Sequence, residues 1–510
     1  MKILKSYIKV PLVALCAFLY VSIMQIFSLS SDTDTDLYFL ISNGWEVIRN
    51  RAVPHYMFST LHEGFHTIMQ QWAMSVIDAT AYNIAGYIGI KVISLLGYIV
   101  SVLICFLYIQ KKVKSQSLQI LALSLVSFPF CYFMNGRPWE ASVCMICAFV
   151  YFSERYCESK NWKWLISWPI LSVLLSNFQA ALWGLLLCFG LTYVCPNLMA
   201  FKTVSAIKRE LIPELKKKKV MWLFYFLMIP FACINPNGFE NITYLINSYG
   251  TTSANARITI SEMAEPVIMS VSGVSVLIGA LFLLYYIKKN WDKCEWKDVY
   301  LAIGCLALGV MHLRNVWISS LGCMPIICSV LNDWDKEEES SIKSENKIVK
   351  CLARFSDKVV SKGIISVVLI TVIISVVSMI AFLAMGRNHD VDGGRTPVLA
   401  ADYLDKVDDD IVLFTGFNNG AYLRFRGYDV YFHAQPELYG KAVNGKRDIY
   451  EEYQNLILEP DFNYESFIDS YGFNYLCVDK NGNLYTYLKY NQDYEIVVDS
   501  EEYALVKKHS

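Results

Sequence analysis

Long apolar runs constrain this chain more than any other feature. A helix needs about 20 consecutive apolar residues to cross the hydrocarbon core of a bilayer. The 510 residues are 55% hydrophobic and only 18% charged, whereas soluble chains have about 25% charged residues. We expect membrane-spanning helices near residues 8–29, 84–109, 117–134, 139–153, 164–177, 180–196, 220–235, 267–287, 298–313, 315–331 and 363–386. The sequence therefore predicts a polytopic α-helical membrane protein with about eleven transmembrane helices.

The 45 Lys and Arg residues indicate the orientation, because these residues are retained in short loops on the cytoplasmic side. With the N-terminus in the cytoplasm, the inner segments hold 27 of them, the outer loops and span edges hold six, and residues 387–510 hold 12. An odd number of crossings then places the C-terminal part outside. Some of the runs between 139 and 196 are short, so one adjacent pair could be a re-entrant hairpin, and losing a pair leaves the orientation unchanged. We expect a multi-pass protein of the cell membrane with a cytoplasmic N-terminus.

The chain is expected to divide into a membrane part and an outer part. The predicted units are a membrane domain at 1–331 with a long outer first loop at 30–83, a charged cytoplasmic linker at 332–362, a last transmembrane helix at 363–386 and a soluble extracytoplasmic domain at 387–510.

Short alternating stretches in residues 387–510 predict a small α/β domain. The predicted strands are Ile411–Phe414, Val430–Phe432 and Tyr475–Val478, and the predicted helices are Pro397–Val407 and Tyr464–Tyr471.

Polar side chains gather in the loops that this topology places on the outer face. The first loop carries Asp34 and Asp36, and the other outer connections carry Arg137, Asn177, Gln179, Asn235, Glu262, His312 and Arg314. Ionisable residues at membrane depth are costly and usually line a protein interior or a water-filled cavity. The alternative is that these are ordinary polar loops in which the arginines snorkel to the membrane surface.

Several of these residues stand in an order that resembles the GT-C superfamily of membrane glycosyltransferases, which includes protein O-mannosyltransferases and the aminoarabinose transferases that modify lipid A. The matching elements span nearly the whole chain: Asp34-x-Asp36-Leu37, Gly44, Val53-Pro54, Phe58-Ser59-Thr60, Trp72, Arg137-Pro138, Asn235-Pro236-x-Gly238, Gly420-x-Tyr422-Leu423 and Glu437-Leu438-Tyr439. The chain departs from the family pattern at Met57, Gln71, His433 and Gln435, where the family often has charged residues.

The resemblance implies a GT-C-like fold and transfer of a sugar from a polyprenyl-phosphate donor, in contact with membrane lipid, to a hydroxyl of a glycan, lipid or protein acceptor. Asp36 and Asp34 are the candidate general bases, since a base must take the proton of the attacking hydroxyl. Arg314, Arg137 and His312 are the candidate ligands of the donor phosphate, because arginine offers paired donors to phosphate oxygens. The remaining candidate substrate ligands are Asn177, Gln179, Asn235 and Glu262.

A divalent cation, Mg²⁺ or Mn²⁺, is a further expectation, with Asp34, Asp36 and Glu262 as candidate ligands because hard cations favour carboxylate oxygen. The chain lacks nucleic-acid-binding motifs. Two other classes stay open: a transporter or flippase of lipid-linked glycans, and a non-catalytic membrane receptor or assembly protein.

Overall fold

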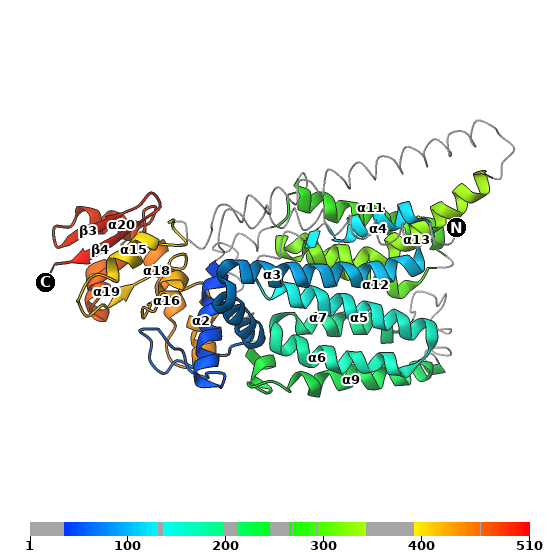
Figure 1. The fold of residues 1–510 in the computed structure, drawn as a ribbon, viewed down its shortest axis with the longest axis horizontal. Coiled ribbons are helices and arrows are strands. Elements are labelled where there is room, and N and C mark those ends of the chain that lie inside the picture. The colour runs from blue at the N-terminus through cyan, green and yellow to red at the C-terminus, as the bar shows by residue number, and fades with distance from the viewer. Residues whose placement is uncertain are drawn as a thin grey trace.

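The computed structural model describes residues 35–127, 129–130, 136–196, 212–213, 215–244, 265–267, 270–291, 294–342, 392–459 and 461–509. The predicted spans at 8–29 and 363–386, together with Asp34 and Glu262, lie outside these residues. The described part forms an elongated molecule in which a helical bundle stands beside a smaller C-terminal domain (Figure 1).

The bundle helices run side by side along the long axis (Figure 1). They are α3 (Trp72–Lys112), α4 (Gln116–Ser127), α5 (Trp139–Ser159), α6 (Ser167–Phe178), α7 (Trp183–Val194), α9 (Lys219–Ala232), α11 (Val271–Asn290), α12 (Trp296–Met311) and α13 (Val316–Ile342). Three short 3-10 helices join some of them: η2 (Trp162–Ile166), η3 (Ala180–Leu182) and η7 (Leu313–Asn315). Each predicted span from 84–109 to 315–331 overlaps one of these helices.

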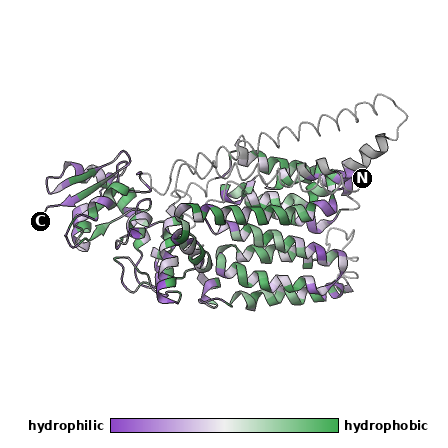
Figure 2. Cartoon of the chain, viewed as in Figure 1, coloured by the Kyte–Doolittle hydropathy of each residue, from purple (hydrophilic) through white to green (hydrophobic). Residues whose placement is uncertain are grey.

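Three helical segments among the described residues are long and apolar enough to cross a membrane: Trp72–Lys112, Ser272–Asn290 and Leu313–Trp334. Shorter apolar segments lie at Ala180–Val194 and Lys219–Ala232. Hydrophobic residues predominate along the bundle helices (Figure 2), and many large apolar side chains of these helices are exposed. On α3 they recur every three or four residues and form one exposed face, made of Val92, Leu96, Val100, Leu103 and Leu107. Such a stripe on the outer surface is suited to lipid.

A kink divides α3 close to the start of the predicted span. Gly86 has φ +58 and Ala85 is also non-helical, and glycine adopts such a positive φ without steric cost. The part before the kink packs against α2 (Thr35–Asn50), which crosses the end of the bundle (Figure 1). The long first loop therefore contains a helical pair rather than an extended connection.

The C-terminal domain is built around a four-stranded mixed sheet with the order β1-β2-β4-β3. The strands are β1 (Leu413–Phe414), β2 (Tyr475–Asp479), β3 (Tyr494–Asp499) and β4 (Tyr503–Lys508). The helices are α15 (Val398–Leu404), α16 (Gly420–Phe425), η8 (Pro436–Tyr439), α17 (Lys441–Asn444), α18 (Ile449–Leu458), α19 (Tyr464–Tyr471) and α20 (Asn483–Tyr490). The α/β character expected from the sequence is confirmed.

One predicted strand is not part of this sheet. Val430 forms single parallel bridges with Leu413 and with Thr60 of the first loop, and the backbone of Phe432 is bonded instead to the Thr415 side chain, which donates to the carbonyl oxygen at 2.7 Å. The segment after Val430 therefore leaves the ladder, and its aromatic rings pack into the core below the sheet.

The two faces of β2 serve different cores, because alternate side chains of a strand point to opposite faces. Leu476 and Val478 join the core of α18, α19 and α20. Tyr475 and Cys477 join a second core that includes α15, α16 and also Leu37 and its neighbours on α2. The domain is therefore packed directly onto the helix that carries Asp36.

Candidate active site

A cavity of about 770 Å³ lies where the end of the bundle meets the C-terminal domain. Its apolar walls come from η3, α7, α12 and α13 and include Leu182, Leu185, Leu308, Met311 and Ile318. Its polar lining comes from both parts of the molecule: Asp36, Gln70, Gln71, Arg137, Gln179, His312, Arg314, Asn315, Arg395, Asn418, Gln435 and Glu437. The cavity is therefore amphipathic and is closed by two parts of the chain that are far apart in sequence.

Asp36 enters the cavity from the first turn of α2. Its Oδ2 lies 3.6 Å from Nη2 of Arg137, and the side chain stays 32% exposed while that of Arg137 is 14% exposed. The positive end of the helix dipole at this N-terminus favours the ionised carboxylate. The geometry thus presents a paired but accessible carboxylate to the cavity.

Arg137 is held by a turn that a buried acid stabilises. Gly136 has φ +73, and its backbone N–H donates to Oε1 of Glu140 at 2.8 Å. The Arg137 N–H donates to the same oxygen at 3.2 Å, and Ser94 Oγ donates to it at 2.7 Å. Glu140 was not identified as a site residue from the sequence. Its position, three residues after the arginine at the start of an apolar helix, is the signal that could have revealed this role.

Arg314 and His312 reach the cavity from the junction of α12 and α13. His312 ends α12, and Arg314 lies in η7. Asn315 fixes the turn, since its Nδ2 donates to the Leu308 carbonyl oxygen at 3.2 Å. Two arginines from different inter-helix turns therefore line one cavity together with Asp36.

Glu437 is an acidic group that the C-terminal domain contributes to the same cavity. It lies in η8, and the hydroxyl of Tyr244 donates to its Oε1 at 3.1 Å. Burial raises the pKa of Glu437, while the Tyr244 hydrogen bond and the charge of Arg314 oppose that rise. The sequence marked Glu437 only as part of a motif, because nothing in its local pattern shows that the domain folds back onto the bundle.

The predicted amide ligands divide into two groups. Gln179 lines the cavity and accepts a hydrogen bond from Ser142 Oγ at 2.6 Å. Asn177 and Asn235 lie outside the lining. Asn177 accepts from Trp72 Nε1 at 2.8 Å and donates to the carbonyl oxygen of Ile234 at 2.9 Å.

Asn235 holds its own turn, since its Nδ2 donates to the carbonyl oxygens of Ala232 and Gly238. Both asparagines thus make bonds that stabilise the fold, and substrate binding by either stays a prediction.

The suggested cation site cannot be assembled from what the structure describes. Asp34 and Glu262 lie outside the described residues. Within the described ranges, no three His, Cys, Asp or Glu side chains gather closely enough to hold a metal ion. Binding of Mg²⁺ or Mn²⁺ stays a prediction.

Behind the cavity, Arg424 joins the C-terminal domain to α2. Its Nη2 donates to Asn43 Oδ1 at 3.0 Å, and the guanidinium lies 4.2 Å from the centre of the Phe58 ring. Burial lowers the pKa of Arg424 to about 10. Burial and the charge of Arg424 hold the pKa of His433 well below its usual range. His433, a departure from the family pattern, thus belongs to this packed junction.

No protein-family model matches the sequence, and no curated protein matches it. The structure is similar to the apo crystal structure of ArnT from Cupriavidus metallidurans, with a TM-score of 0.50 and 12% sequence identity over 99% of this chain and 98% of that chain. At this identity the likeness shows the fold. The chain has the GT-C fold that the sequence predicted, with its C-terminal domain included in the match.

Proposed function

We propose that this protein is a membrane glycosyltransferase that moves a sugar from a polyprenyl-phosphate donor to an acceptor hydroxyl at the outer face of the membrane, with inversion at the anomeric carbon. The observation that carries the proposal is that Asp36, Arg137 and Arg314 line one cavity together with an apolar wall. A lipid-linked donor has a charged phosphate and an apolar chain, which match the arginines and the apolar wall of this cavity.

Each part of the cavity has a place in the proposed reaction. The apolar side chains of α7 and α12 accept the first isoprene units, and the arginines bind the phosphate oxygens. The acceptor oxygen attacks the anomeric carbon as the bond from that carbon to the phosphate oxygen breaks. The electron pair leaves with the polyprenyl phosphate, and Asp36 takes the proton of the acceptor hydroxyl.

The pairing of Asp36 with Arg137 has a consequence for this mechanism. An arginine beside a carboxylate lowers the basicity of that carboxylate. The negative charge of a donor phosphate bound to Arg137 offsets the positive charge that Arg137 places beside Asp36. The Asp36 carboxylate is therefore a stronger base when the donor is bound. If the donor binds first, Asp36 becomes a stronger base only when a sugar is present. The acceptor hydroxyl is then deprotonated only when its oxygen has an anomeric carbon to attack.

The C-terminal domain supplies the wall that faces the acceptor. Arg395, Asn418, Gln435 and Glu437 extend from it into the same cavity. These groups can form hydrogen bonds to the hydroxyl groups of an acceptor.

The test is Asp36→Asn in the purified full-length protein, assayed with a panel of radiolabelled polyprenyl-phosphate sugars and acceptors. We expect transfer to fall by roughly a hundredfold or more, because loss of a general base typically costs this much. Asp408→Asn, the same substitution at an exposed position of the C-terminal domain, is the matched control and should retain activity.

Retained transfer in the Asp36 variant would remove Asp36 as the base. A parent protein that transfers no sugar from the full panel, but binds the lipid-linked donors, would instead favour the transporter class. A protein that neither transfers nor binds them would favour the receptor or assembly class.

A further inference from the structure

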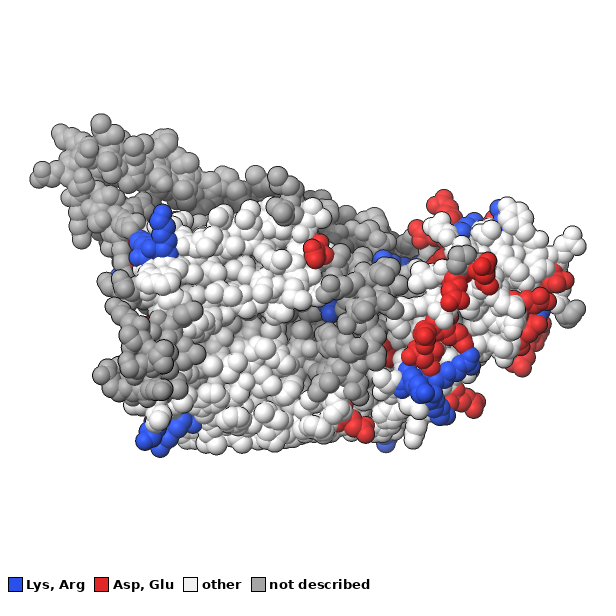
Figure 3. All heavy atoms as spheres, turned by 180° about the vertical axis from the view of Figure 1, so that it is seen from behind, with Lys and Arg blue, Asp and Glu red and all other residues white. Residues whose placement is uncertain are grey.

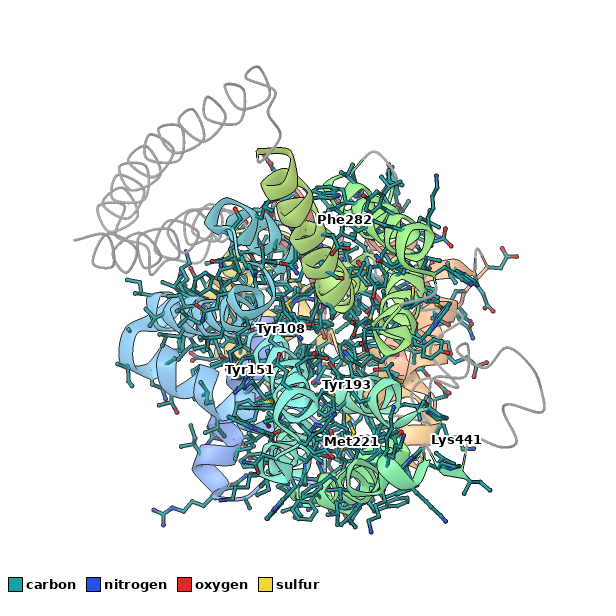
Figure 4. The ribbon with its side chains drawn as sticks, turned by 90° about the vertical axis from the view of Figure 1, so that its right-hand side faces the viewer. Tyr108, Tyr151, Tyr193, Met221, Phe282 and Lys441 are labelled. Carbon is teal, nitrogen blue, oxygen red and sulfur yellow. The ribbon has the colours of Figure 1, made fainter. Side chains whose placement is uncertain are left out.

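A second cavity, of about 800 Å³, lies at the end of the bundle away from the C-terminal domain. It opens among the last turns of α3, α5 and α7 and the first turns of α9 and α12. Figure 4 views this end of the bundle and shows Tyr108, Tyr193 and Met221 near its centre. None of its lining residues belongs to the candidate active site.

The inner wall of this cavity carries charges that compensate one another. Lys297 Nζ lies 2.6 Å from Oε1 of Glu154 and 2.7 Å from Oδ1 of Asp298. Lys112 Nζ lies 3.1 Å from the other oxygen of Glu154. A ligand therefore does not have to neutralise these buried groups.

The rim of the cavity is different, because Lys160 and Lys217 are exposed there. Neither lysine forms an ion pair with a carboxylate within the described ranges. Lys218, between them and the interior, donates to the carbonyl oxygens of Tyr193 at 2.9 Å and Cys195 at 2.6 Å. The exposed acids Glu158 and Glu295 also line the cavity, but Glu158 is paired with Lys112, so the lysines of the rim leave an excess of positive charge. The wall beneath the rim combines the paired charges with tyrosine rings.

A buried polar atom of the wall also has no hydrogen-bond partner within the described ranges. It is Oδ1 of Asn332, which lines the cavity. Buried polar atoms are seldom left in this condition without water or a ligand. A headgroup hydroxyl in the cavity gives this amide oxygen a partner.

We propose that this cavity binds the phosphate headgroup of an anionic phospholipid from the leaflet on that side of the membrane. Lys160 and Lys217 face the phosphate, and Met221 and the tyrosine rings contact the glycerol and the upper acyl chain. Basic pockets between membrane helices bind anionic headgroups in this way. On the face shown in Figure 3, patches of Lys and Arg are visible at this end of the bundle. The proposal does not depend on the proposed transferase activity.

Native mass spectrometry of the full-length protein, delipidated and then incubated with phosphatidylglycerol or phosphatidylcholine, tests the site. We expect phosphatidylglycerol adducts to predominate, and their affinity to fall roughly tenfold in the Lys160→Gln/Lys217→Gln double variant, because each juxtamembrane lysine adds to anionic-lipid binding. The Lys160→Arg/Lys217→Arg variant keeps the charge and should keep the adducts. Lys114→Gln/Lys288→Gln removes two exposed lysines outside the cavity and should bind as the parent does.

Equal loss of adducts in both glutamine variants would overturn the proposal, since it would mean that general charge attracts the lipid. Displacement of phosphatidylglycerol by millimolar inorganic phosphate would overturn it in favour of a free-phosphate site. Equal binding of the two lipids would also overturn it. If the double glutamine variant does not stay folded, each single glutamine variant is measured, and each is expected to lose roughly threefold in affinity.

Discussion

At Glu437 in the candidate active site, burial and neighbouring groups act on the pKa in opposite directions. Glu437 is half-buried between the C-terminal domain and the bundle, with Tyr244 as a donor and Arg314 nearby. Burial makes ionisation of the Glu437 carboxyl less favourable, and Tyr244 and Arg314 both stabilise the ionised form. Its protonation therefore links the docking of the domain to pH.

We expect Glu437→Gln to become stabilising relative to the parent as pH rises above the ordinary glutamate pKa of 4.5. A carboxyl group whose folded-state pKa is raised holds its proton more tightly in the folded chain, so the parent loses stability while the pH rises through that range. The Gln variant has no proton to lose. Thermal unfolding of the detergent-purified protein from about pH 4 to about pH 8 measures the difference.

Glu459→Gln is the matched control for this titration, because Glu459 is an exposed residue of the same domain. The difference in unfolding temperature between this control and the parent should stay constant over the same range. A constant difference for Glu437→Gln as well would show that Glu437 ionises equally easily in the folded and unfolded chain.

The grouping of candidate residues in one cavity was predictable from the sequence where membrane topology alone brings them together. Asp36 lies at the start of α2, and Arg137 and Arg314 lie in separate inter-helix turns. Their expected position on one side of the membrane was enough to group them. Glu437 and Arg395 could not be grouped in this way, because they reach the cavity only through tertiary docking of a domain far along the chain. The catalytic and binding roles of all these residues stay predictions.

At the scale of elements, the crossing of α2 over α3 depends on one glycine. A Cβ atom built on Gly44 would lie 2.0 Å from the carbonyl oxygen of Ser75 and 2.6 Å from the Cβ of Ala79. The Trp45 Nε1 then donates across the pair to Asn83 Oδ1 at 2.9 Å. The close approach explains why a glycine is needed eight residues after Asp36.

Gly44→Ala is therefore expected to lower the free energy of unfolding by about 1–3 kcal/mol, the usual cost of overpacking a tight contact. It should also lower sugar transfer, because separating the two helices moves Asp36 relative to Arg137. Gly304→Ala in α12 is the control, since an added Cβ meets nothing within 4 Å there. Chemical or thermal unfolding of both variants gives the comparison, and equal stability of the two would refute the close-contact explanation.

The sequence predicted the bundle helices better than the structure of the first loop. Continuous hydrophobicity defines a span, whereas α2 is a short amphipathic helix whose apolar side is recognisable only once its partner is known. The same reasoning applies to Val430–Phe432, whose alternation resembles a strand. The rings of Tyr431 and Phe432 pack instead in a core that includes residues of the first loop.

At the scale of the whole molecule, two cavities lie at opposite ends of one bundle. The cavity next to the C-terminal domain combines acids, arginines and an apolar wall, and the other combines exposed lysines with aromatic side chains. The charge pattern of the sequence predicts that the lysine-rich end faces the cytoplasm. Orientation therefore decides which leaflet supplies the donor and which supplies the proposed phospholipid.

Cysteine labelling tests this orientation directly. Glu501→Cys introduces an exposed thiol in the C-terminal domain, and Lys114→Cys introduces one at the opposite end of the bundle. The domain's own Cys477 is buried, so the parent protein gives the background. We expect a membrane-impermeant maleimide to label Glu501→Cys in intact cells and to label Lys114→Cys only after permeabilisation.

The reverse result would have a specific consequence, because the C-terminal domain and the turns carrying Asp36 and Arg314 line the same cavity. Labelling of Glu501→Cys only after permeabilisation would place that entire cavity on the cytoplasmic side. The lysines at the other end would then face outward, against the usual distribution of positive charge. Such a protein would require a donor in the inner leaflet, so a single labelling experiment determines the side on which any transfer reaction must be sought.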